Sequence, residues 1–234
     1  MDMIFRNRHD AGRQLAERLV EYAGRPGVVV LGLPRGGVPV AYEVAHILGV
    51  PLDVFVVRKL GSPGHEELAM GAIASGDVCV LNTSLIRQLG ISKDAVERVK
   101  ANEKVELERR ERAYRGDRPP VDAHGSTVLV VDDGLATGAT MLAAVEALRA
   151  QHATRIVVAV PVASREACAS LAQVADRCVC LSTPADFYGV GSWYEDFSQT
   201  SDDVVRNLLD RAALLLLDDA RHGAAIAHPA RNPA

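Results

Sequence analysis

Two adjacent carboxylates at the end of an apolar run are the side chains of this chain best placed to do chemistry. Asp132 and Asp133 follow Val128–Val131, a run of four apolar residues that is typical of a buried parallel strand. In open α/β sheets, ligands bind where strands end and helices begin. We therefore expect a ligand to lie over the segment Asp132–Thr140, ahead of a helix formed by Met141–Leu148.

The turn after the two acids is suited to a phosphate. Small residues let a phosphate approach the main chain, and free N–H groups at the start of a helix point toward it. The turn has no lysine, which excludes a Walker-type loop. Two acids beside a phosphate must face sugar hydroxyls or a Mg²⁺ ion, so the pattern favours a ribose 5-phosphate. The small and hydroxyl-bearing residues are Gly134, Ala136, Gly138, Ala139, Thr137 and Thr140.

The whole pattern resembles the PRPP-binding signature of the type I phosphoribosyltransferases. The family's order is four apolar residues, two acids, three variable residues and Thr-Gly-x-Thr, and this chain has the same order. Its sequence Asp-Asp-x-Leu-Ala-Thr-Gly-x-Thr is most similar to that of adenine-type members. The alternative is an ordinary strand and helix with acids in the connecting loop. The resemblance implies that the ribose and 5-phosphate of PRPP contact Asp132, Asp133, Gly134, Leu135, Ala136, Thr137, Gly138, Ala139 and Thr140.

A second glycine-containing turn could bind pyrophosphate. Arg35, Gly36 and Gly37 follow an expected strand at Val28–Leu31 and precede an expected helix at Val40–Leu48. Glycines in this position form an anion site, and an arginine can donate two hydrogen bonds to a phosphate group. The resemblance implies that these three residues hold the pyrophosphate of PRPP. A purely structural strand-helix turn is the alternative.

Two cations are expected at the carboxyl end of the next strand, Pro51–Val57. Arg58 and Lys59 suit a leaving group with several negative charges, and we expect them, with Asp133, to be catalytic. Their alternative is a solvated pair of charges. The following segment, Leu60–Glu67, has the composition of a mobile loop and by resemblance closes over PRPP. His65 and Glu66 are the candidates to act in that lid, although a loop histidine is commonly just exposed.

Two features of the sequence bear on the identity of the acceptor base, and they favour different bases. Aromatic residues gather in Pro184–Phe197, where Phe187, Tyr188 and Trp193 could stack on a base or form a small satellite core. Members of the family that use 6-oxopurines carry an aspartate just before Thr-Gly, and this chain has Ala136 there. The missing carboxylate favours adenine, while a base or amine outside the standard salvage set stays open.

The order of the expected elements predicts an α/β fold. Alternating strands and helices give a mostly parallel phosphoribosyltransferase-type sheet with helices on both faces. We expect a domain at 1–200 that contains a charged helical insertion at about 92–115 and a small hood at about 182–200. A C-terminal helix and tail follow at 201–234, with the tail from His222. The other expected elements are a helix from an Asp10 cap to Tyr22, a hairpin of Leu68–Ile73 and Val78–Leu81, strands at Arg155–Pro161 and Cys178–Leu181, and a helix at Ser164–Ala175.

The composition of the chain argues against some classes of binding partner. The net charge is −4, with both signs mixed along the chain, which argues against nucleic acid and membrane surfaces. The chain has no signal-peptide pattern and no apolar run of roughly 18 residues, so we expect a cytoplasmic protein. The cysteines lack the Cys-x-x-Cys spacing of zinc sites and are interpreted as reduced, mostly buried thiols, with metal binding as the alternative. They are Cys79, Cys168, Cys178 and Cys180.

The resemblance implies a reaction in which a ring nitrogen of a small-molecule base replaces pyrophosphate on PRPP, as in nucleotide salvage. Mg²⁺ is the implied cofactor, bound at Asp132 and Asp133 through water or ribose hydroxyls. A regulator that binds PRPP or a nucleotide without transfer is the alternative on the same fold. A phosphohydrolase is a third hypothesis, although further metal ligands are missing near the two acids. We expect the charged helix to begin at a Ser92 cap and to carry two i,i+4 ion pairs, Glu106 with Arg110 and Glu108 with Arg112. It is interpreted as solvated, with a homodimer contact left open.

Overall fold

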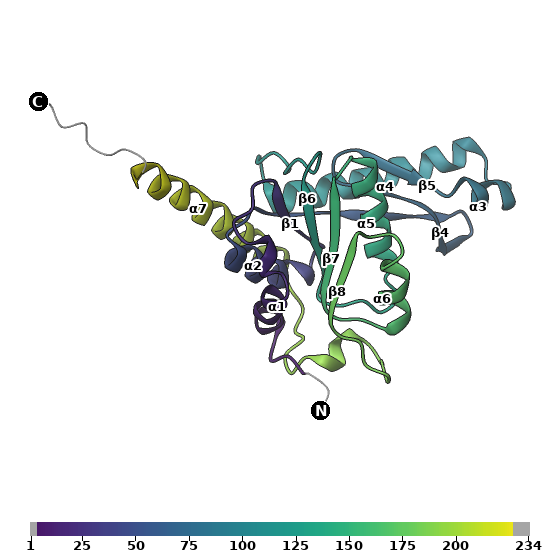
Figure 1. Ribbon diagram of the computed structural model, residues 1–234. Coiled ribbons are helices and arrows are strands. Elements are labelled where there is room, and N and C mark those ends of the chain that lie inside the picture. Colours follow the sequence, from purple (N-terminus) through teal and green to yellow (C-terminus); the bar gives the residue numbers. More distant parts are fainter. Residues whose placement is uncertain (1–3, 227–234) are drawn as a thin grey trace, which may run out of the picture.

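Apolar strands form the centre of the structure. The computed structural model describes residues 4–226, with the side chains of residues 4–215. A parallel sheet has the order β2-β1-β6-β7-β8, with the predicted signature strand β6 at its centre (Figure 1). This α/β arrangement confirms the fold class predicted from the sequence. The strands are β1 (Val28–Gly32), β2 (Leu52–Val54), β6 (Thr127–Val131), β7 (Arg155–Val162) and β8 (Arg177–Ser182).

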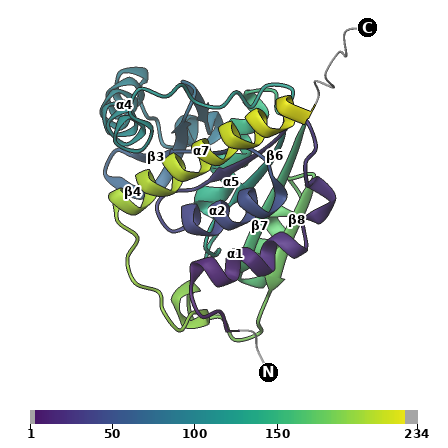
Figure 2. The ribbon, with the colours of Figure 1, turned by 90° about the vertical axis from the view of Figure 1, so that its left-hand side faces the viewer.

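Helices cover both faces of this sheet because alternate residues of its buried strands point to opposite sides. Leu129 and Val131 of β6 pack with α1 (Arg8–Glu17) and α2 (Gly37–Leu48). Val128 and Val130 pack on the other face with α5 (Ala139–Ala150) and α6 (Arg165–Leu171). In Figure 2, α7 (Asp202–Ile226) crosses over α2. Among the described residues, no helix has the length and apolar character needed to cross a membrane.

A second, antiparallel sheet corrects the expected position of the cations. It consists of β3 (Val57–Ser62), β4 (His65–Ala74) and β5 (Val78–Leu81) in that order, and is followed by α3 (Thr83–Gln88). The expected strand Pro51–Val57 is therefore divided between β2 and β3. Arg58 and Lys59 lie inside β3 rather than at the carboxyl end of a core strand, because the chain leaves the parallel sheet after Val54.

The segment Leu60–Glu67 is the tip of the β3–β4 hairpin, not the irregular loop that its composition predicted. Ser62 pairs with His65, and the turn between them contains Gly64 at φ +78°. Glycine tolerates that left-handed conformation without a steric cost. A Cβ atom on Gly61 would lie 2.7 Å from the carbonyl oxygen of Glu66, so the two strands can approach this closely only with glycine there. Close pairing of the strands thus replaces the expected loop.

The charged helix α4 (Lys93–Arg115) begins at the predicted cap, Ser92, whose side chain accepts from the N–H of Ala95 at 3.2 Å. Its apolar residues Val96, Leu107 and Tyr114 are buried against β3, β4 and α7. Of the two predicted i,i+4 ion pairs, Glu106–Arg110 is present at 2.7 Å. In place of the predicted Glu108–Arg112 pair, Glu108 lies 3.8 Å from Lys104. The helix is therefore solvated on one side only.

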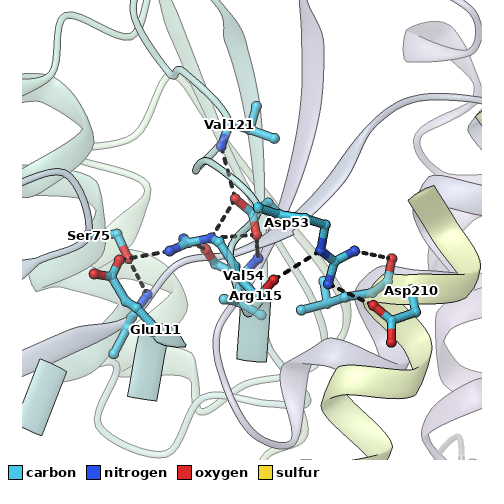
Figure 3. Close-up of polar contacts among 10 residues, drawn as sticks. Asp53, Val54, Ser75, Glu111, Arg115, Val121 and Asp210 are labelled. Atoms are coloured by element: carbon cyan, nitrogen blue, oxygen red, sulfur yellow. Dashed lines mark hydrogen bonds and ion pairs between the residues drawn. The ribbon is translucent and has the colours of Figure 1, made fainter. Parts of the chain in front are cut away.

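A buried ion pair ties α4 to the core sheet (Figure 3). Nε of Arg115 lies 2.9 Å from both carboxylate oxygens of Asp53, and Nη2 donates to the carbonyl of Val54 at 2.7 Å. Asp53 also accepts from the N–H groups of Val54 and Val121. Because every oxygen of this buried carboxylate has donors, the pair satisfies the condition under which a buried charge is tolerated.

The amino-terminal helix is capped differently from the prediction. The side chain of Asn7 accepts from the N–H of Asp10 at 2.9 Å, so Asn7 and not Asp10 is the cap. Asp10 lies in the first turn and accepts from the N–H of Arg6 at 3.1 Å. The helix ends at Glu17, and a short 3₁₀ turn, η1 (Val20–Tyr22), follows. At the other end, α7 reaches Ile226 where a tail from His222 was expected, and residues 227–234 lie outside the described residues.

Candidate functional site

The two predicted anion loops meet at the carboxyl ends of β1 and β6. A Cβ atom on Gly36 would overlap the carboxylate of Asp133. A Cβ atom on Gly37 would lie 2.7 Å from the carbonyl oxygen of Val131 and 2.8 Å from Cα of Asp132. Both glycines are therefore required by contact with the signature loop. In the segment that leads into them, the peptide bond between Pro34 and Arg35 is cis.

The environment of the two adjacent acids, Asp132 and Asp133, raises the pKa of both carboxyl groups. Burial and the neighbouring Asp133 carboxylate raise the pKa of Asp132 well above its usual range. Burial also raises the pKa of Asp133, but the guanidinium of Arg8 opposes that rise. Oδ1 of Asp132 accepts from the N–H of Asp133 at 2.9 Å, which fixes the first carboxylate. Burial and the neighbouring carboxylate therefore both disfavour the charged form of Asp132 at the point where a ligand is expected.

Arg8 is the main site residue that sequence reasoning missed. Its Nε donates to Oδ2 of Asp133 at 2.8 Å, and its Nη1 donates to the carbonyl of Ser198 at 2.7 Å. The guanidinium carbon lies 3.9 Å from the ring centroid of Phe197. Arg8 and Asp133 are 125 positions apart in sequence, so no local pattern could have predicted the contact.

The turn between β6 and α5 has the form of an anion site. Gly138 precedes α5 at φ +73° and offers no side chain to the first N–H groups of the helix. Thr137 and Thr140 are exposed beside it. Ser164 stabilises the turn, because its Oγ donates to the carbonyl of Ala136 at 2.7 Å. Leu135 is buried and its N–H donates to Val162, so this residue anchors the turn.

The aromatic segment lies against the signature loop. Tyr194 donates from its hydroxyl to the carbonyl of Asp133 at 2.6 Å. Its pKa is raised by burial and by the charge of Asp133. Trp193 and Tyr194 are buried with Phe5 in a small core, as the satellite-core alternative predicted for this segment. Of the other stacking candidates, Phe187 is half-buried and Tyr188 is 88% exposed.

Val190 of the hood packs against the turn between β6 and α5. A Cβ atom on Gly134 would lie 2.5 Å from Cγ1 of Val190 and 3.1 Å from Cγ1 of Val162. The turn η2 (Val190–Trp193) is thus seated on the glycine that follows the two acids. The segment that could contact a base and the segment that could bind the ribose are adjacent in space.

Of the three cations expected to bind pyrophosphate, Arg35 and Arg58 lie beside acidic side chains, and Lys59 does not in the part of the chain that the structure describes. Arg35 adjoins the glycine loop, with Nη1 at 3.7 Å from Oδ1 of Asp202. Arg58 is paired with Glu103 of α4, with Nη2 at 2.6 Å from Oε2. Among the described residues Lys59 has no ion-pair partner, and it lines a cavity of about 330 Å³ together with Ala139 of α5.

The lid candidates lie at the hairpin tip. His65 and Glu66 are exposed at the start of β4. Glu66 lines a cavity of about 500 Å³ between the hairpin and α4, where Arg58 and Lys59 also lie. The structure therefore brings Glu66 near the two predicted cations, and leaves His65 on the surface.

Comparisons with known proteins agree with this geometry. The family model described as a phosphoribosyl transferase domain matches residues 1–194. Two Mycobacterium tuberculosis proteins are each 50% identical over 209 residues, which cover 89% of this chain and 47% of the relative. They are named "Putative phosphoribosyl transferase MT0597", from strain CDC 1551, and "Putative phosphoribosyl transferase Rv0571c", from strain H37Rv. The chain thus spans about half the length of these curated relatives.

A solved structure is similar over nearly its whole length. The crystal structure of TT1426 from Thermus thermophilus has a TM-score of 0.81 and 45% sequence identity, and the match covers 88% of this chain and 98% of that one. The fold described above is therefore similar to that of a solved chain with 45% sequence identity to this one.

Proposed function

Because the chain belongs to the phosphoribosyl transferase family, we propose that it transfers the phosphoribosyl group of PRPP to a nitrogenous base and releases pyrophosphate. In this reaction a bond forms between a ring nitrogen and the anomeric carbon. The bond from that carbon to the pyrophosphate oxygen breaks, its electron pair leaves with pyrophosphate, and the proton of the ring nitrogen passes to solvent. The observation that carries the proposal is the contact of Gly36 and Gly37 with Asp132 and Asp133.

Each part of the site then has a role in holding PRPP. The uncapped start of α5, with Thr137 and Thr140, binds the 5-phosphate. Asp132 and Asp133 accept hydrogen bonds from the ribose diol. Binding energy gained at the remote phosphate aligns the anomeric carbon, which is how a distant contact lowers the barrier.

The departing pyrophosphate needs positive charge. Gly36 and Gly37 lie against Asp133 and Asp132, and in this proposal their main chain and the adjoining Arg35 contact the pyrophosphate. Lys59 is the second cation in this proposal, and Arg58 joins once it is released from Glu103. Preorganised donors of this kind stabilise charge that develops in the transition state.

The two acids also fit Mg²⁺. Carboxylate oxygens are ligands this ion prefers, and a cation would offset both the burial that mainly raises the pKa of Asp132 and the smaller effect of the Asp133 carboxylate. Asp132 and Asp133 would hold the ion through water or ribose hydroxyls, with one oxygen of Asp133 already occupied by Arg8. When bound, Mg²⁺ supplies charge neutralisation of the pyrophosphate.

The acceptor in this proposal is a purine, with adenine favoured, used in nucleotide salvage in the cytoplasm. Ala136 provides no carboxylate to a 6-oxopurine, and it is exposed at the turn. Phe187 and Tyr188 of the hood are the side chains left accessible for stacking on a base, since Trp193 is buried.

A second function is favoured by one observation. Both arginines expected to hold pyrophosphate have acidic partners, Arg35 with Asp202 and Arg58 with Glu103. A regulator on the same fold that binds a nucleotide, with no pyrophosphate at this position, would not need to release them, whereas a protein that holds PRPP would. Product formation separates this alternative from the enzyme.

Calorimetric titration with PRPP, with and without Mg²⁺, tests the proposal. We expect binding strengthened by Mg²⁺, and no binding to a variant with both Asp132→Asn and Asp133→Asn. Asp122→Asn, an exposed acid before β6, is the matched control and should bind as the unaltered protein does. Undiminished affinity in the double variant would reject the site. Release of pyrophosphate on adding adenine or another base would identify the enzyme, and binding without release would identify the regulator.

A further inference from the structure

Three of the four cysteines converge beside the last strand of the parallel sheet. Cys178 and Cys180 are two residues apart on β8, so their side chains share one face. Cys168 lies on α6, which packs next to β8 (Figure 1). Among the described residues, this is the only group of three or more His, Cys, Asp or Glu ligand atoms within 4.8 Å of one another. The fold therefore creates a cluster that the sequence spacing did not reveal.

The dimensions of this thiol cluster suit one metal ion. The Sγ atoms of Cys178 and Cys180 are 3.7 Å apart, and those of Cys168 and Cys178 are 3.9 Å apart. A zinc–sulfur bond of about 2.3 Å places two ligand sulfurs about 3.8 to 4.0 Å apart in tetrahedral or trigonal geometry. The third pair, Cys168 and Cys180, is closer at 2.8 Å. Rotation of one side chain about its Cα–Cβ bond would open that pair.

The donor set identifies the class of ion. All three donors are sulfur, and no carboxylate or imidazole joins them within that radius among the described residues. Soft thiolates select Zn²⁺ and Cu⁺, whereas Mg²⁺ takes oxygen ligands. We propose that Cys168, Cys178 and Cys180 form a three-thiolate site for a thiophilic d¹⁰ cation, Zn²⁺ or Cu⁺. The three side chains are half-exposed, which gives the ion a route of entry.

The position of the site gives the ion a structural effect. It would join α6 to β8, and α6 supports the ligand turn. Ala167, next to Cys168, lies 3.2 Å from the position of a Cβ atom on Gly138, and Ser164 at the start of the helix holds Ala136. Because an ion that binds only the folded state stabilises it, thermal unfolding should shift to higher temperature.

Competition titrations test the proposal on the full chain, reduced and handled without oxygen. Zn²⁺ is titrated against a chromophoric chelator, and Cu⁺ against bicinchoninate. We expect one ion per chain to be withdrawn from at least one chelator, and the measured ion identifies the metal. Cys168→Ser, Cys178→Ser and Cys180→Ser should each weaken binding at least tenfold. Cys79→Ser, the cysteine outside the cluster, is the matched control and should bind normally.

Alkylation of the unaltered protein gives a second readout that does not depend on the variants folding. Bound metal should protect the three cluster cysteines from iodoacetamide and leave the labelling of Cys79 unchanged. Failure to withdraw either ion would overturn the proposal, as would an equal loss of binding in Cys79→Ser. A disulfide between Cys168 and Cys180 in the protein as purified, with no metal uptake after reduction, would also overturn it and would identify an oxidation site instead.

Discussion

Arg8 of α1 donates from Nε to Oδ2 of Asp133, 2.8 Å away, at the carboxyl end of the central strand. The side chains of the two residues are 11% and 15% exposed, so the ion pair is largely removed from water. The amino-terminal helix therefore completes the electrostatics of a loop that lies 125 positions later in the chain. This contact makes α1 part of the site rather than a cover for the sheet.

Removal of Arg8 should destabilise the fold through Asp133. Arg8→Leu leaves a carboxylate without its cation, at a cost of about 1–3 kcal/mol in the free energy of unfolding. In the double variant with Asp133→Asn, that charge is absent and part of the loss should be recovered. Urea denaturation of the four proteins in this cycle measures the coupling. Arg13→Leu, which removes a more exposed ion pair, is the control, and strictly additive effects of the Arg8 and Asp133 changes would contradict the prediction.

Gly36→Ala should block the site by steric conflict alone. The backbone at Gly36 has φ −63°, which alanine adopts freely, so what opposes the change is the overlap with Asp133, with Nε of Arg8 also 3.2 Å from the added Cβ atom. We expect a loss of about 1–3 kcal/mol in unfolding free energy, as for overpacking elsewhere, together with loss of PRPP binding. Asp133→Ala in the same chain removes the main obstacle and should recover part of the stability, because Arg8 then lacks its partner, without restoring binding. Normal PRPP affinity in Gly36→Ala would show that the two loops do not form one site.

The raised pKa of Asp132 predicts how stability depends on pH. An acid whose pKa is higher in the folded state contributes stability that is full below its unfolded value, about 3.9, and is lost as pH rises through the folded pKa. Asp132→Asn stays uncharged, so it should be more stable than the unaltered protein at neutral pH. The difference should shrink as the pH is lowered through the folded pKa. Thermal unfolding across a pH series measures this, with exposed Asp186→Asn as the control.

Glu103 should limit the availability of Arg58. Glu103→Gln removes the ion pair in which Nη2 of Arg58 lies 2.6 Å from the carboxylate. We expect pyrophosphate to bind about two- to fivefold more tightly, since half-exposed pairs are worth about 0.2–1 kcal/mol. Calorimetry with pyrophosphate measures the change. Glu97→Gln on the same helix should have no effect, and unchanged affinity in Glu103→Gln would remove Arg58 from the site.

The Asp53–Arg115 pair should control the attachment of α4. Arg115→Met leaves a buried carboxylate without its cation and should cost about 3–5 kcal/mol in unfolding free energy. Asp53→Asn should cost less, because the amide keeps an oxygen for one of the two N–H groups, of Val54 or Val121, and Arg115 keeps its ion pair with Glu111. Denaturant unfolding orders the two variants. A smaller loss of unfolding free energy in Arg115→Met than in Asp53→Asn would contradict this order. It would show that the hydrogen bonds of Asp53 to the main chain contribute more than its ion pair with Arg115.

The conformation of the turn between β6 and α5 was predictable from the sequence because the residues that determine it are close together in the chain. The apolar run that forms β6, the two acids at its end and the glycine before α5 are consecutive, and strand burial and helix starts depend on such neighbours. The alternation of strands and helices likewise predicted the parallel sheet, and Ser92 predicted the start of α4. The roles of the individual site residues stay predictions until binding is measured.

Tertiary structure alone decided the rest, because those features depend on residues that are far apart. Arg58 and Lys59 lie in an antiparallel hairpin since β3 pairs with β4, a choice that composition could not show. The Arg8–Asp133 contact joins α1 to β6, and the three thiols meet only because α6 folds back beside β8. The sequence thus determined which polar residues follow β6, while packing determined that Arg8 lies beside them and that three thiols meet between α6 and β8.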